Sequence, residues 1–220
     1  MTRETGDRAA FLERIRRAVT APTTGHARPI TPLPPAGPPA VAYATEPDFA
    51  AALEGLGGVV RSLVDAEAFT AFVDDALDAA KGDNARVRVL LTDEPECAAV
   101  AYALGKRNDV DVVAFTDAAA AATADIGFTG ARAGVARTGS IVVDSGRAGG
   151  RTASLLPPMH VALLRADGVV RDPGDLWRSL GAPLPSNLVQ ITGPSRSADI
   201  ELIITLGVHG PRALWVGLLV

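Results

Sequence analysis

The sequence predicts an α/β fold of three layers, in which helices cover both faces of a mainly parallel sheet. Between Val59 and Phe115 short apolar runs alternate with stretches of helical periodicity, which is the pattern of strands joined by crossover helices. Apolar residues make up 48% of the 220 residues but aromatic residues only 5%, so small aliphatic side chains must fill the interior. That composition suits helices packed on a parallel sheet.

The first 40 residues differ in texture from the rest of the chain. Apolar residues recur at helical spacing between Arg8 and Thr20, with Glu13 and Arg17 as an i,i+4 pair, so residues 1–20 are expected to form an amphipathic helix. Residues 21–40 contain seven prolines and are expected to form an extended tether to a domain over residues 41–220. The tether either lies along its own domain or lets the helix reach a neighbouring subunit.

Within the domain, apolar period and capping residues define the individual elements. Helices are expected at Glu46–Leu56, Ala66–Ala80, from Thr92 or Asp93 to Gly105, and at Ala118–Ala124, Asp175–Leu180 and Asp199–Gly207. Strands are expected at Val59–Leu63, Val87–Leu91, Val110–Phe115, Ile141–Val143, Val161–Leu164 and Ala213–Val220. Asp65 is placed to cap the second helix, and Gly207 to end the last one in a left-handed conformation.

The last thirty residues concentrate turn signals and charged side chains. Ser195 or Ser197 is expected to cap the helix that begins near Asp199, which leaves Arg196, His209 and Arg212 on two loops. A helix start together with two guanidinium groups favours an anion pocket. In the alternative interpretation, the arginines pair with Asp199 and Glu201 and only brace the turns.

A glycine-rich loop over residues 146–151 offers a second set of anion ligands. The backbone N–H groups of Gly149 and Gly150 could cradle a phosphate or carboxylate, and Arg147 and Arg151 add positive charge. We expect this loop and the Gly193–Arg212 segment to converge on one pocket near the carboxyl edge of the sheet, lined by Ser195, Arg196, His209 and Arg212. The spacing matches neither a P-loop nor a dinucleotide fingerprint, and an ordinary flexible crossover is the alternative.

Composition excludes several other classes of function. A net charge of −4 with scattered arginines argues against nucleic-acid binding, and no apolar stretch is long enough to span a membrane. The lone Cys97 cannot form an intrachain disulfide or hold an iron–sulfur cluster, which fits a cytoplasmic setting. The three histidines have no metal-ligand spacing, so neither metal nor other cofactor is expected in the chain. His160 and His209 either face each other or are each hydrogen-bonded to the main chain.

Several motifs together resemble the lactate-utilisation domain family over about Val41 to Val220. They are Ala124-Asp125-Ile126-Gly127-Phe128-Thr129-Gly130, Thr138-Gly139-Ser140, Leu155-Leu156-Pro157-Pro158-Met159-His160, Gly193-Pro194-Ser195-Arg196-Ser197-Ala198-Asp199-Ile200-Glu201 and Gly207-Val208-His209-Gly210-Pro211. The resemblance implies a fold similar to that of the ribose-phosphate isomerase, glucosamine-phosphate deaminase and CoA-transferase group. It also implies a role in oxidising L-lactate to pyruvate beside partner proteins that carry iron–sulfur clusters.

Two classes of function follow from these observations. In the first, the protein is an accessory subunit that binds a small anionic metabolite or a partner. In the second, it is an isomerase- or acyl/CoA-transferase-like enzyme acting on a small phosphorylated or carboxylate substrate, with Asp144 or Asp199 as base or nucleophile. A carboxylate without a partner visible in the sequence favours the first class, and the sequence leaves the oligomeric state open.

Overall fold

The chain divides into two compact units, Met1–Pro38 and Pro39–Val220. The computed structural model describes residues 13, 16, 17, 41–113, 118–146, 151–181, 184, 185, 187–198 and 204–220. In the first unit, the three described residues are helical, and Arg17 Nε lies 3.4 Å from Glu13 Oε1. The rest of the predicted N-terminal helix and the tether lie outside the described residues.

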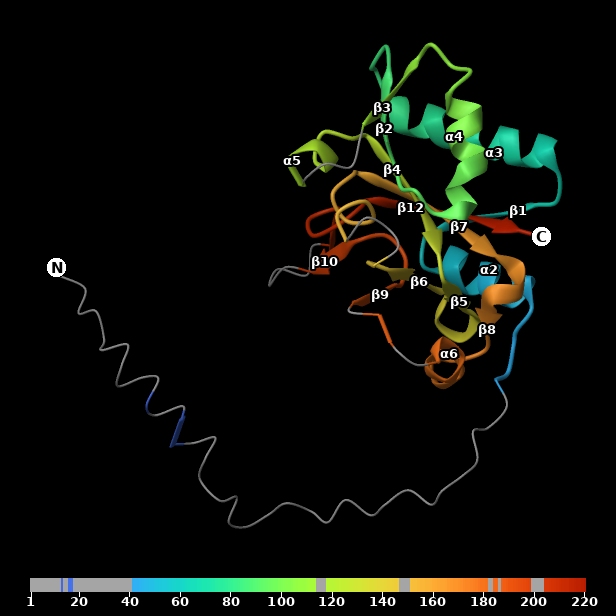
Figure 1. The fold of residues 1–220 in the computed structure, drawn as a ribbon, viewed down its shortest axis with the longest axis vertical. Helices are drawn as coiled ribbons and strands as arrows, with labels where there is room; N and C mark the ends of the chain where they lie inside the picture. Colours follow the sequence, from blue (N-terminus) through green and yellow to red (C-terminus); the bar gives the residue numbers. More distant parts are fainter. Residues whose placement is uncertain are drawn as a thin grey trace. The chain divides into compact units, whose positions relative to one another are not determined.

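A six-stranded parallel sheet forms the centre of this unit (Figure 1). Its strands, in spatial order, are β1 (Val59–Leu63), β12 (Ala213–Leu219), β7 (Met159–Arg165), β4 (Ile126–Ala131), β2 (Val87–Leu91) and β3 (Val110–Val113). Every neighbouring pair is parallel. The predicted α/β class with a mainly parallel sheet is therefore confirmed.

Helices cover one face of the central sheet. They are α3 (Ala66–Lys81), the short 3-10 helix η1 (Pro95–Cys97) and α4 (Ala98–Leu104). Phe72, Leu77 and Val100 are buried there against the strand residues Val89 and Phe128. As predicted, Asp65 caps α3, because its Oδ1 accepts a 2.8 Å hydrogen bond from the Ala68 backbone N–H.

The other face is covered by helix α2 (Glu46–Gly55) and, against expectation, by a second sheet (Figure 1). This sheet has the order β8 (Val169–Val170), β5 (Ala133–Val135), β6 (Ser140–Asp144) and β9 (Leu188–Ile191), and its β6 is antiparallel to both neighbours. Phe49 and Leu53 of α2 pack with Ile141, Leu164 and Val216 between the two sheets. Helix α6 (Pro173–Leu180) covers the outer side of the second sheet.

Several predicted helix boundaries are corrected by the structure. The helix expected from Thr92 or Asp93 begins at Pro95, with Glu94 as its N-cap. The helix Ala118–Ala124 is shortened to α5 (Ala118–Ala121). Two further 3-10 turns are η2 (Ala136–Thr138) and η3 (Ala166–Gly168).

The helix predicted over Asp199–Gly207 is wrong where the structure describes it. Strands β10 (Arg196–Ala198) and β11 (Ile204–Leu206) form an antiparallel pair, while residues 199–203 lie outside the described residues. The β-branched pair Ile204-Thr205 favours a strand, and pairing with β10 satisfies its backbone groups. Gly207 has the expected positive φ of 77°, but it follows a strand.

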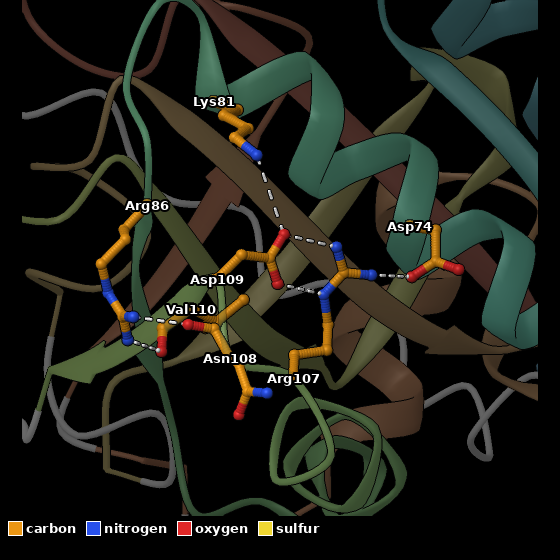
Figure 2. Close-up of polar contacts among 7 residues, drawn as sticks. All are labelled: Asp74, Lys81, Arg86, Arg107, Asn108, Asp109 and Val110. Atoms are coloured by element: carbon orange, nitrogen blue, oxygen red, sulfur yellow. Dashed lines mark hydrogen bonds and ion pairs between the residues drawn. The ribbon is translucent and has the colours of Figure 1, made fainter.

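A network of ion pairs fixes the edge of the central sheet near β3 (Figure 2). Arg107 contacts Asp74 of α3, and its Nη2 lies 2.9 Å from Asp109 Oδ2. Lys81 approaches the same carboxylate at 3.8 Å. The guanidinium of Arg107 is the main cause that lowers the pKa of Asp109. One arginine thus ties α3 to the turn that leads into the edge strand.

Within the part of the chain that the structure describes, no helix is both long and apolar enough to cross a membrane.

Candidate ligand-binding site

A cavity of about 160 Å³ lies where the central sheet meets β9 of the second sheet. Its lining residues are Arg151, Ser154, Leu155, His160, Val189, Gln190, Ile191, Gly193, Ser195, His209, Gly210, Pro211 and Leu214. Arg151, Gln190 and His209 are exposed, whereas Ser154, His160 and Leu214 are buried. The cavity therefore has a polar, solvent-accessible part, and its buried part combines the polar side chains of Ser154 and His160 with the apolar side chain of Leu214.

The cavity is located at the amino ends of two neighbouring strands. His160 is the second residue of β7 and pairs with Leu214, the second residue of β12. The anion pocket was expected at the carboxyl edge of the sheet, whereas this cavity lies at the opposite end. The reason is tertiary: β9, together with the turns before β7 and β12, encloses the amino ends of these strands.

His160 is the most unusual side chain in the cavity, because it is 0% exposed. Its Nε2 lies 2.9 Å from the hydroxyl of Thr129 on the adjacent strand β4. Its Nδ1 has no hydrogen-bond partner among the described residues. Burial lowers the pKa of His160 from 6.5 to about 3, so the imidazole is neutral at physiological pH. Most buried polar atoms in proteins are paired, so this unpaired nitrogen is an exception.

The Thr138-Gly139-Ser140 motif contacts Gln190, a residue of the cavity lining, through the Ser140 hydroxyl. The buried Ser140 hydroxyl lies 2.7 Å from that of Thr138 and 2.8 Å from that of Thr192, and it is 3.1 Å from Gln190 Nε2. Gln190 lines the cavity, so this hydroxyl network holds one of its polar side chains. Gly139 adopts a positive φ of 58°, and a Cβ built on it would lie 2.5 Å from the backbone nitrogen of Leu53. The motif thus brings α2 and β6 into close contact.

The structure brings some of the predicted ligand-binding residues together at the cavity. Ser195 and His209 both line it, as does Arg151 from the end of the glycine-rich loop. The Ser195 N–H donates to the Pro211 carbonyl at 2.8 Å, which holds the two parts of the C-terminal segment side by side. His160 and His209 line the same cavity. Gly149, Gly150 and Arg147 lie outside the described residues.

Arg196 and Arg212 are not among the residues that line this cavity. Arg196 lines a neighbouring surface pocket, and its Nη2 donates a 2.5 Å hydrogen bond to the Leu56 carbonyl, at the end of α2. The Arg212 side chain is exposed, and its backbone N–H donates to the Pro158 carbonyl at 2.8 Å. Arg196 therefore braces the end of α2, as in the alternative interpretation of the arginines. Its partner is a backbone carbonyl, however, and not Asp199 or Glu201.

The two candidate catalytic carboxylates are also separate from the cavity. Asp144 ends β6, where its Oδ1 accepts a 2.9 Å hydrogen bond from the Gly146 N–H and its Oδ2 lies 3.9 Å from Arg132 Nη1. It shares a much smaller cavity, of about 10 Å³, with Glu94 and Glu96. Asp199 lies outside the described residues. Among the residues that the structure describes, no three His, Cys, Asp or Glu side chains are grouped so that they could hold a metal ion.

Sequence reasoning missed the roles of Thr129, Ser140 and Gln190. Thr129 lies in the stretch Gly127-Phe128-Thr129-Gly130, whose glycines do not suggest a strand, although it forms the buried β4. Gln190 interrupts an apolar run and is partnered by Ser140, fifty positions earlier. A polar residue within an otherwise apolar strand is the only signal that the sequence offers for such a contact.

The fold and the cavity define a mixed α/β protein with a small, partly polar cavity between two sheets. The LUD domain profile matches residues 78–219, and the chain belongs to this family. The resemblance stated from the sequence motifs is therefore confirmed.

Two curated relatives share the same printed name. The chain is 41% identical over 100 residues to Lactate utilization protein C of Halalkalibacterium halodurans, a match that covers 42% of this chain and 44% of that relative. It is 37% identical over 94 residues to Lactate utilization protein C of Bacillus subtilis, covering 40% of this chain and 39% of that relative. The matches span about two fifths of the length of these relatives.

One solved structure has a similar fold. The crystal structure of a DUF162 family protein from Deinococcus radiodurans superposes with a TM-score of 0.54 at 22% identity, covering 79% of this chain and 94% of that chain. At this level of identity the likeness concerns the fold alone.

Proposed function

We propose that this protein is an accessory component of a system that oxidises L-lactate to pyruvate, and that it binds a small carboxylate in the cavity between the two sheets. The observation that carries the proposal is the presence of Arg151, Ser195 and His209 around one cavity. The names of the two curated relatives supply the metabolic context.

The lining suggests how such a ligand would be held. The guanidinium of Arg151 would pair with the carboxylate at the exposed part of the cavity, with Ser195 and His209 as further hydrogen-bonding groups. Leu155 and Leu214 would contact a short carbon chain. A site with a few polar groups and apolar walls suits a metabolite of a few carbon atoms.

The other parts of the proposal come from the family resemblance. The protein would use no cofactor of its own and would act in the cytoplasm beside partner proteins that carry iron–sulfur clusters. In this arrangement electron transfer belongs to the partners, and this chain would bind the metabolite or present it.

Isothermal titration calorimetry with L-lactate and pyruvate tests the binding step. Arg151→Ala should weaken binding by about tenfold, the lower end of the range for a charged hydrogen bond, because Arg151 is exposed and water screens its charge. Arg196→Ala is the matched control: its guanidinium contacts Leu56, so it should lower stability and leave affinity unchanged. Absence of binding by the wild type would overturn the proposal, and loss of binding in Arg196→Ala alone would move the site to the neighbouring pocket.

A further inference from the structure

A second cavity, of about 300 Å³, lies at the carboxyl ends of the neighbouring strands β4 and β7. Ala131 and Arg165, the last residues of these strands, both line it. Ligands of open parallel sheets bind beyond the carboxyl ends of the strands. The cavity of about 10 Å³ beside Asp144 shares Glu96, Ala131 and Arg132 with it, so the two form one hollow, here called the Arg132 cavity. It has no lining residue in common with the cavity between the two sheets.

Arg132 directly follows β4, and its guanidinium is only partly paired. Its Nη2 donates to the Leu180 carbonyl at 3.3 Å, and its Nη1 lies 3.9 Å from Asp144 Oδ2, which is too far for a hydrogen bond. A guanidinium has five N–H donors, and these are its only side-chain contacts of this kind among the described residues. The remaining donors are therefore available to water or to a ligand.

The carboxylates around Arg132 differ in how far the fold already uses them. Glu94 is 7% exposed, and its Oε2 accepts two 2.6 Å hydrogen bonds, one from a hydroxyl and one from a backbone N–H. Asp144 accepts a backbone N–H and is the ion-pair partner of Arg132. The half-buried Glu96 carboxylate, in contrast, forms neither a hydrogen bond nor an ion pair with any residue that the structure describes. Glu96 is thus the acceptor of this lining that the fold leaves uncommitted.

The two uncommitted charges face one hollow without neutralising each other. Glu96 and Arg132 line both parts of the Arg132 cavity, yet within the described chain they form no ion pair with each other. A Cβ at Gly130 would lie 3.0 Å from Glu96 Oε2, so glycine leaves room for this carboxylate beside the end of β4. Arg165 and Asp167 also line the cavity, but their charges cancel in a 2.9 Å pair.

We propose that the Arg132 cavity binds a free α-amino acid, whose carboxylate pairs with Arg132 and whose ammonium group pairs with Glu96. An α-amino acid carries both charges on one carbon atom, so it satisfies both side chains at once. A simple carboxylate would leave Glu96 unpaired beside a second negative charge, and a simple amine would do the same to Arg132. A volume of about 300 Å³ is at the small end of the range for metabolite sites. This site is additional to the proposed function, and neither requires the other.

Saturation-transfer nuclear magnetic resonance on the full chain, with each of the twenty common amino acids as probe, tests for binding, and calorimetry then measures the affinity. Two analogues of each amino acid that binds are the matched probes: the carboxylic acid without the amino group and the amine without the carboxylate. Each analogue should bind at least about tenfold more weakly, because it loses one charge-assisted hydrogen bond. Binding of no amino acid, or equal binding of either analogue, would overturn the inference.

Substitutions test the two charged contacts separately. Glu96→Gln and Arg132→Gln should each weaken binding of the amino acid by about tenfold. Arg165→Gln is the matched control, because Arg165 lines the same cavity but is paired with Asp167, and it should leave the affinity unchanged. If Arg132→Gln does not fold, Glu96→Gln still decides, since its carboxylate has no described partner to lose. An unchanged affinity of Glu96→Gln would contradict the proposal.

One further variant separates this inference from the proposed function. Arg151→Ala alters the cavity between the two sheets and should leave amino-acid binding unchanged. Failure of the wild type to bind L-lactate or pyruvate would overturn the proposed function and leave this inference in place. Loss of amino-acid binding in Arg151→Ala would instead place the amino acid in the cavity between the sheets and overturn this inference.

Discussion

Replacing Gly139 by alanine should destabilise the protein strongly, because this residue is where η2 contacts the backbone of α2. A Cβ at position 139 would lie 2.5 Å from Leu53 N, 2.6 Å from Ala52 C and 2.8 Å from Leu53 Cα. These atoms belong to a helix backbone and cannot turn aside as a flexible side chain could. Either α2 or the turn before β6 must therefore move.

The magnitude has two parts. Forcing alanine into the left-handed region at φ 58° costs about 1–2 kcal/mol. Overpacking a close contact costs about 1–3 kcal/mol more. The sum, about 2–5 kcal/mol, is a large part of the roughly 5–15 kcal/mol that stabilises a typical domain.

Urea denaturation followed by circular dichroism measures this effect. Gly55→Ala is the matched control, because Gly55 ends α2, has nothing within 4 Å of a built Cβ and has no positive φ. It should leave the free energy of unfolding unchanged or raise it by up to about 1 kcal/mol. If Gly139→Ala unfolds within about 0.5 kcal/mol of the wild type, the close contact between η2 and α2 does not constrain the fold as described.

Two further predictions concern His160 and the ion pairs near β3. Because burial lowers the pKa of His160 from 6.5 to about 3, the unfolded chain takes up a proton first as the pH falls. The free energy of unfolding should therefore drop by about 2 kcal/mol between pH 7 and pH 5. Denaturation midpoints of His160→Gln should show a flatter pH profile, and an unchanged slope would contradict the argument. Arg107→Gln should lower the Tm by about 2 °C, because Arg107 links α3 to the turn before β3. Arg165→Gln, which breaks an exposed pair with Asp167 two residues away, should not change the Tm, and equal shifts in the two variants would count against a linking role.

Local sequence signals were sufficient to predict most helices and strands in the first half of the domain. The strand Val59–Leu63 and the helix after Asp65 were predicted with their observed starts. The strand directly follows the glycine pair Gly57-Gly58, and the helix combines an apolar period with Asp65 as its cap. Where propensity, pattern and capping agree, tertiary contacts have little to override.

The second sheet could not be read from the sequence. Strands β5 and β8 have three and two residues, which is too short to establish an alternating pattern. Strand β9 pairs with β6 across more than forty intervening residues, and no local signal specifies such a partner. Strand β4 of the central sheet was also missed, because glycine is unfavourable in strands and β4 contains two. One of them, Gly127, is required by packing, because a Cβ at this position would lie 2.3 Å from the Ala153 carbonyl oxygen.

The candidate site shows the same division. Ser195, His209 and Arg151 could be proposed from the sequence because turns and glycines place them on loops, where ligands bind. The sequence does not indicate which of the arginines lines the cavity. Arg196 instead donates to the Leu56 carbonyl, which lies 140 positions earlier in the chain.

The residues thus specify the α/β class, the family motifs and the side chains with suitable chemistry, since these depend on local pattern and residue type. Tertiary packing alone sets the place of the cavity and the state of His160. The second sheet closes over the amino ends of β7 and β12, and the imidazole loses water on every side while only one of its nitrogens gains a partner. Burial and pairing of that kind depend on contacts between segments far apart in the chain, which no local pattern encodes.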